Sequence, residues 1–126
     1  MSNQQKQTLK FFKRHSEEWN KKANDKFYSV MNDRHRAVHR CLDNYPKKSL
    51  FLDIGCGTGQ LAIEASKNGF ISHGIDFAEE MIEISKNNSQ KENSDATFEV
   101  ASIFNYTVKS PYDVISAMGF IEYITP

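Results

Sequence analysis

The chain has 126 residues, which suits one domain with a modest hydrophobic core. Its 16 basic and 16 acidic side chains cancel, so the composition gives no electrostatic reason to expect nucleic acid or an anionic membrane as a partner. The polar N-terminus and the lack of a long apolar run predict neither a secretory signal nor a membrane span, and therefore a cytoplasmic protein.

Two amphipathic helices are predicted in the first part of the chain, at Leu9–Trp19 and at about Lys26–Leu42. His35 and His39 are four residues apart on the second helix, as metal ligands would be, but no third ligand is apparent and we expect no metal. We interpret residues 1–46 as a helical cap on an α/β unit, residues 47–126.

A strand-forming run, Leu50–Ile54, leads directly into three glycines at alternate positions, Gly55, Gly57 and Gly59. A helical pattern begins at Gln60. Glycine permits a tight turn and a close approach of the backbone to a ligand, and a helix N-terminus offers unpaired N–H groups. This stretch therefore predicts a nucleotide-like ligand, with a purely structural glycine turn as the alternative.

The remaining predicted elements are a helix ending at Asn68-Gly69, a strand Phe70–Ile75 ending at Asp76, a helix Ala78–Asn87, a polar loop to Asp95, a strand Ala96–Ala101, and a strand Tyr112–Met118. Strands that alternate with helices through right-handed crossovers form a parallel sheet. The last strand is largely apolar, so we expect it to be buried on both faces.

The spacing of the glycines distinguishes between nucleotide-binding loops. A nicotinamide dinucleotide site requires G-x-G-x-x-G, whereas here the sixth position is Gln60 and the third glycine comes one residue early. No Gly-Lys-Ser/Thr follows, so the phosphate loop of nucleotide triphosphatases does not fit either. Asp76 lies about 20 residues beyond the first glycine, where a carboxylate can accept hydrogen bonds from both ribose hydroxyls of a nucleoside.

The string Leu52-Asp-Ile-Gly-Cys-Gly-Thr-Gly59 resembles the first motif of class I S-adenosylmethionine-dependent methyltransferases, in their small-molecule branch. The resemblance extends to about residue 124 and covers the N-terminal part of that family's domain. It implies an α/β fold with a Rossmann-like, doubly wound sheet, here its first four parallel strands in the order 3-2-1-4. The cofactor-binding residues that it implies are Asp53, Gly55, Cys56, Gly57, Gly59, Asp76, Phe77, Met81, Ser102, Ile103, Ala117, Met118 and Gly119.

The sequence departs from the family pattern in two ways. Ser102 stands where the family commonly has an aspartate for the adenine amino group, so the backbone near Ile103 is the alternative partner for adenine. The family's sheet has seven strands in the order 3-2-1-4-5-7-6, and this sequence supplies four. The absent strands normally carry much of the substrate pocket.

The resemblance implies transfer of the sulfonium methyl of S-adenosylmethionine to a small molecule by in-line displacement, leaving S-adenosylhomocysteine. No catalytic base is evident, and we interpret Glu122 and Tyr123 as a solvated loop pair. The alternative is a non-catalytic fragment that binds either cofactor form but lacks the substrate-binding half. The fourth strand would then be an unpaired apolar edge, which favours self-association.

Overall fold

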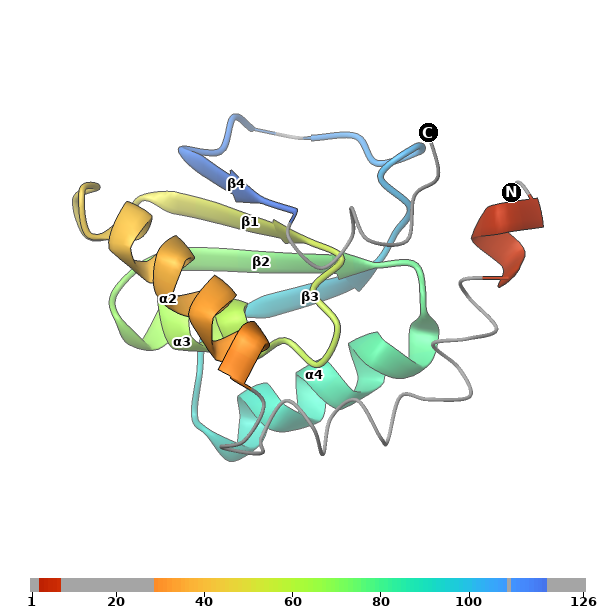
Figure 1. Cartoon of the computed structure of the whole chain (residues 1–126), viewed down its shortest axis with the longest axis horizontal. Helices are drawn as coiled ribbons and strands as arrows, with labels where there is room; N and C mark the ends of the chain where they lie inside the picture. The colour runs from red at the N-terminus through yellow and green to blue at the C-terminus, as the bar shows by residue number, and fades with distance from the viewer. Residues whose placement is uncertain (1–2, 8–28, 109, 118–126) are drawn as a thin grey trace.

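The computed structural model describes residues 3–7, 29–108 and 110–117. Its elements are α2 (Ser29–Leu42), β1 (Leu50–Ile54), α3 (Gln60–Lys67), β2 (Ile71–Asp76), α4 (Glu79–Lys91), β3 (Thr97–Val100) and β4 (Val114–Ser116), and residues 3–7 are also helical (Figure 1). The predicted helix at Leu9–Trp19 lies outside the described residues, as does the start of the second helix. Among the described helices, none is both long and apolar enough to cross a membrane.

The four strands form one parallel sheet in the order β3-β2-β1-β4, which confirms the predicted topology. At the middle of the sheet, Leu52 of β1 pairs with His73 of β2 on one side and with Ile115 of β4 on the other. All strands point the same way, so their carboxyl ends meet at one edge (Figure 1).

The sheet has two differently covered faces. Helices α2, α3 and α4 gather on one of them (Figure 1), over two apolar clusters. The clusters consist of Val38, Leu42, Phe51, Leu61, Ala65 and Phe70, and of Cys56, Ala62, Ile63, Ile82, Ala96 and Phe98. On the other face, Leu52, Ile54 and Ile75 are covered by residues that follow β3, among them Ile103 and Tyr106.

Helices α3 and α4 end in the same way, with a left-handed residue just after the helix. After α3, Gly69 adopts a left-handed conformation (φ 98°) while Phe70 N donates to Ala65 O, as predicted from the glycine. After α4, Asn93 takes that role (φ 54°) and Ser94 N donates to Ser89 O. The prediction that α4 ends at Asn87 is therefore wrong by four residues, because an asparagine also tolerates the left-handed conformation.

The outer strands are shorter than predicted. Strand β4 spans three residues instead of Tyr112–Met118, and Ile115 is 55% exposed on the face away from the helices. The expectation that this strand is buried on both faces is wrong for the described residues, since the residues after β3 cover the centre of that face and leave Ile115 open. Likewise, Val100 at the end of β3 is half exposed.

Candidate functional site

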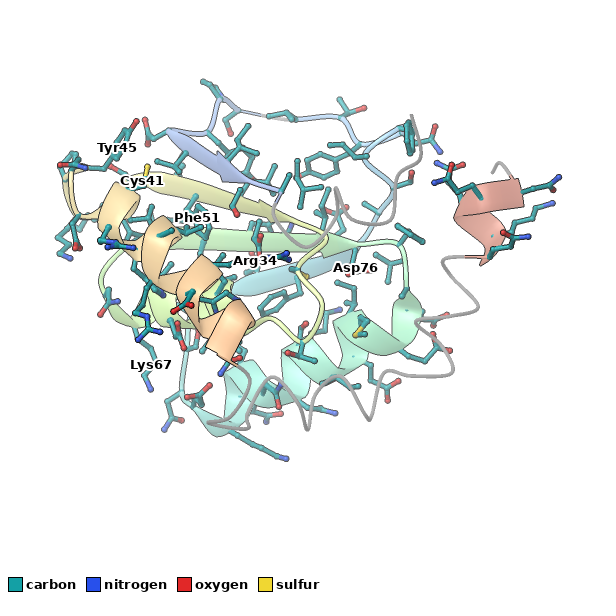
Figure 2. The ribbon with its side chains drawn as sticks, in the orientation of Figure 1. Arg34, Cys41, Tyr45, Phe51, Lys67 and Asp76 are labelled. Atoms are coloured by element: carbon teal, nitrogen blue, oxygen red, sulfur yellow. The ribbon has the colours of Figure 1, made fainter. Side chains whose placement is uncertain are left out.

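The predicted site residues meet at the carboxyl edge of the sheet. Asp53 lies near the end of β1, Asp76 ends β2, and Ala117 follows β4. Figure 2 shows Asp76 at the end of β2, beside the loop that leaves β1. In the strand order β3-β2-β1-β4, the chain reverses its direction of travel across the sheet at β1, which is where ligands of open α/β sheets bind.

The three loop glycines all need a left-handed backbone, with φ of 69° at Gly55, 56° at Gly57 and 82° at Gly59. They differ in what surrounds them. A Cβ at Gly57 would have none of the described atoms within 4 Å, whereas a Cβ at Gly59 would lie 2.7 Å from the Phe98 ring and 2.9 Å from Ser85 Cβ. Gly59 is thus required by packing against α4 and β3, and Gly57 borders open space.

Hydrogen bonds from several elements hold the loop in place. Gly55 N and Cys56 N both donate to Ile75 O of β2, at 2.8 and 3.0 Å. Gly59 is the N-cap of α3 and contributes no side chain, so the first N–H groups of that helix receive no side-chain cap. The loop is therefore ordered by the sheet while its helix end keeps donors for a ligand.

Asp76 supports the loop and keeps capacity for a ligand. Its Oδ2 accepts from Gly57 N at 3.0 Å and its Oδ1 from Ala78 N at 2.9 Å. Burial, opposed by these two amide donors, raises the pKa of Asp76 to about 6. A carboxylate has about four acceptor positions, so each oxygen retains one lone pair, enough for two ribose hydroxyls.

Asp53 is the second buried carboxyl at this edge. Burial and the nearby Asp76 raise the pKa of Asp53 to about 8. Ser116, its strand neighbour on β4, opposes this shift without reaching hydrogen-bond geometry, and Ser116 Oγ is buried with no partner among the described residues. A partner supplied by a ligand would satisfy this hydroxyl.

The other predicted cofactor residues fall into two groups. Cys56 and Met81 are buried in the core, and burial raises the pKa of the Cys56 thiol, so Cys56 offers the site only its backbone. The half-buried residues are Phe77, Ser102, Ile103 and Ala117, and the Ser102 hydroxyl already accepts from Phe104 N. Met118 and Gly119 lie outside the described residues, as do Glu122 and Tyr123.

Two site residues were missed by the sequence interpretation. Ser85 Oγ donates to Gly57 O at 2.6 Å, and Asn88 Nδ2 donates to Thr58 O at 3.0 Å. The predicted helix Ala78–Asn87 contains Ser85 without a role for it, and Asn88 falls in the predicted polar loop. The available signal was a serine on the apolar stripe of α4, next to residues such as Met81 that are fully buried.

The histidine pair on α2 has a structural partner. His39 Nε2 lies 2.7 Å from Glu64 Oε2 of α3, and burial lowers the pKa of His35. Among the described residues, no group of three or more potential ligands could hold a metal ion. Arg34 lies on the same helix (Figure 2).

The residues present fit a nucleoside cofactor whose ribose hydroxyls and tail can donate hydrogen bonds. The site combines open space beside Gly57, free acceptor positions on Asp76, and the unsatisfied hydroxyl of Ser116. Gln60 Oε1, at the start of α3, is another buried polar atom without a partner among the described residues.

Comparison with known proteins finds a methyltransferase domain, whose family model matches residues 47–125. A ubiquinone biosynthesis O-methyltransferase from Coxiella burnetii is 30% identical over 74 residues, which are 58% of this chain and 32% of that protein. A protein of the same name from Vibrio campbellii is 28% identical over 75 residues, with the same coverage of 58% and 32%. The chain thus spans about a third of the length of these curated relatives.

Solved structures show the same fold. Magnesium protoporphyrin IX methyltransferase from Synechocystis PCC 6803, with bound SAH, has a TM-score of 0.76 at 19% identity, over 90% of this chain and 57% of that one. A SAM-dependent methyltransferase from Thiobacillus denitrificans, in complex with S-adenosyl-L-homocysteine, has a TM-score of 0.62 at 18% identity, over 74% and 39%.

Proposed function

The chain belongs to the methyltransferase domain family, and on this basis we propose that it binds S-adenosylmethionine and transfers the methyl group to a small-molecule acceptor. The observation that carries the proposal is the glycine loop, where open space beside Gly57 adjoins a carboxylate, Asp76, that keeps two acceptor positions. S-Adenosylhomocysteine is the product that leaves this site.

When bound, the cofactor supplies a methyl group already activated as a sulfonium, so the protein has mainly to position two reactants. In our proposal, Asp76 accepts hydrogen bonds from both ribose hydroxyls, and the loop Gly55–Gly59 supports the methionine part. Phe77 and the backbone near Ile103 flank adenine. Asp53, held close to Asp76, faces the positive end of the cofactor.

The acceptor class is supported by the names of the similar proteins, which refer to ubiquinone biosynthesis and to magnesium protoporphyrin IX. The chain spans about a third of the length of its curated relatives. Methyl transfer by this chain itself is therefore a proposal that needs its own test. Transfer to a panel of phenolic and carboxylate acceptors, followed through release of S-adenosylhomocysteine, tests this step.

Calorimetric titration with S-adenosylhomocysteine tests cofactor binding directly. Asp76→Ala removes a charged acceptor, and we expect it to cost at least roughly 1.5–3 kcal/mol of binding free energy. Asp113→Ala is a matched control, since Asp113 also accepts from a backbone amide, Leu50 N at 2.7 Å, but at the opposite end of β1. Absence of binding by the unmodified chain, or equal losses in both variants, would contradict the assignment, and NADH should not bind comparably.

Three further features belong to the proposal. Residues 1–46 form a helical cap and residues 47–126 the cofactor-binding part, and the protein is cytoplasmic, which cell fractionation would test. The chain also associates with itself through β4, supported by the exposed Ile115 on a strand at the edge of the described sheet.

A further inference from the structure

Two side chains of α4 reach the backbone of the glycine loop. Ser85 Oγ donates to Gly57 O at 2.6 Å, and Asn88 Nδ2 donates to Thr58 O at 3.0 Å. These residues are three apart on the helix and about 30 residues from the loop in sequence, so only the packing of α4 against the loop brings them together.

The burial of Ser85 shows that this contact is specific. Its side chain is fully buried, where a hydroxyl without a partner would cost free energy. Serine in the middle of a helix also lowers helix propensity. The Ser85 hydroxyl instead donates to the Gly57 carbonyl of the loop. A Cβ on Gly59 would come within 2.9 Å of Ser85 Cβ, so the close packing at this point requires a small side chain at position 85.

The contacts fix the orientation of peptide groups that glycine alone would leave free. Gly57 N–H is held by Asp76 Oδ2 and Gly57 C=O by Ser85 Oγ. In a trans peptide the C=O and the next N–H point in opposite directions. Bonding of Gly57 O to α4 therefore turns Thr58 N–H away from α4, where it can serve as a donor to a ligand.

We propose that Ser85 and Asn88 are positioning residues for the cofactor, which hold the loop peptides at Gly57 and Thr58 in their binding orientation without touching the cofactor. The inference rests on the proposed function, because it names residues that serve the same site. Preorganisation of this kind raises affinity by removing the cost of ordering the loop on binding.

Ser89 provides a matched control on the same helix. It is also buried, and its hydroxyl also donates to backbone carbonyls, those of Ser94 and Ala96 at 3.2 and 3.3 Å. These bonds fix the connection from α4 to β3 and not the glycine loop. Ser85→Ala and Ser89→Ala thus remove the same chemical group from one helix, with different predicted effects.

The test compares the two variants by urea unfolding, by calorimetry with S-adenosylhomocysteine, and by hydrogen exchange of the Gly57 amide in the ligand-free chain. We expect Ser85→Ala to weaken binding roughly tenfold, the equivalent of one hydrogen bond, and to speed exchange at Gly57. Ser89→Ala should lose stability but bind within about twofold of the unmodified chain. If Ser85→Ala does not fold, Asn88→Ala tests the same role, because Asn88 is only half-buried. We then expect Asn88→Ala to weaken binding and to speed exchange at Gly57.

Equal binding losses in Ser85→Ala and Ser89→Ala, or normal binding by a folded Ser85→Ala, would overturn the proposal. Failure of the unmodified chain to bind would instead refute the proposed function. Whether Ser85 orders the loop would then be decided by exchange alone, and an unchanged exchange rate of the Gly57 amide in Ser85→Ala would refute that step.

Discussion

Replacement of Gly57 by alanine should impair cofactor binding more than stability, and replacement of Gly59 by alanine should do the reverse. Both glycines have a left-handed backbone, with φ of 56° and 82°. The new methyl group at Gly57 points into space that none of the described atoms fills, whereas at Gly59 it lies 2.7 Å from Phe98 Cζ. The two variants therefore separate the ligand side of the loop from its packed side.

The magnitudes follow from these surroundings. A left-handed alanine costs about 1–2 kcal/mol, and the lower entropy of the unfolded chain offsets about 0.4–1 kcal/mol of this. Gly57→Ala should thus lower the free energy of unfolding by about 1 kcal/mol. Gly59→Ala adds overpacking of about 1–3 kcal/mol, because Phe98 belongs to a buried cluster and cannot move freely.

Cofactor binding should be weakened more by Gly57→Ala than by Gly59→Ala. A methyl group on Gly57 would occupy the space that the cofactor needs, and overpacking of about 1–3 kcal/mol corresponds to a roughly 5- to 150-fold loss of affinity. Urea unfolding gives the stabilities, and calorimetry with S-adenosylhomocysteine gives the affinities. If folded Gly57→Ala binds like the unmodified chain, the loop is a structural turn and not the surface that the cofactor approaches.

Three further predictions concern charge and association. Affinity for S-adenosylhomocysteine should fall as the pH drops below about 6, since Asp76, with its pKa raised to about 6, must be ionised to accept both hydroxyls; a calorimetric series with no such change would contradict this role. The free energy of unfolding should decrease between about pH 4 and pH 8, with Asp53 contributing on the order of 5 kcal/mol, because Asp53 and Asp76 ionise freely in the unfolded chain but have pKa values raised to about 8 and about 6 in the fold; urea unfolding of Asp53→Asn should show a flatter profile above pH 6, and an equally steep one would exclude Asp53 as a cause. Ile115→Lys should shift sedimentation toward monomer, whereas a chain that is monomeric at high concentration without the substitution would show that this edge does not self-associate.

The sequence by itself determined the local framework of the site. Alternate glycines after Leu50–Ile54 predicted a turn before a helix at Gln60, and Gly69 marked the end of that helix. The alternation of strands and helices predicted a parallel sheet, since crossovers between parallel strands have one handedness, and the resemblance to the methyltransferase family implied the order β3-β2-β1-β4. These features depend on backbone conformation and on neighbouring residues, which the sequence displays directly.

Only the tertiary structure decided which glycine borders open space and what holds the loop. Gly57 and Gly59 are equivalent in the sequence pattern, and they differ because Phe98 and Ser85, from distant segments, pack against one of them. The exposure of Ile115 was decided in the same way, by which face the residues after β3 cover. Such contacts join residues far apart in the chain, and no local periodicity records them.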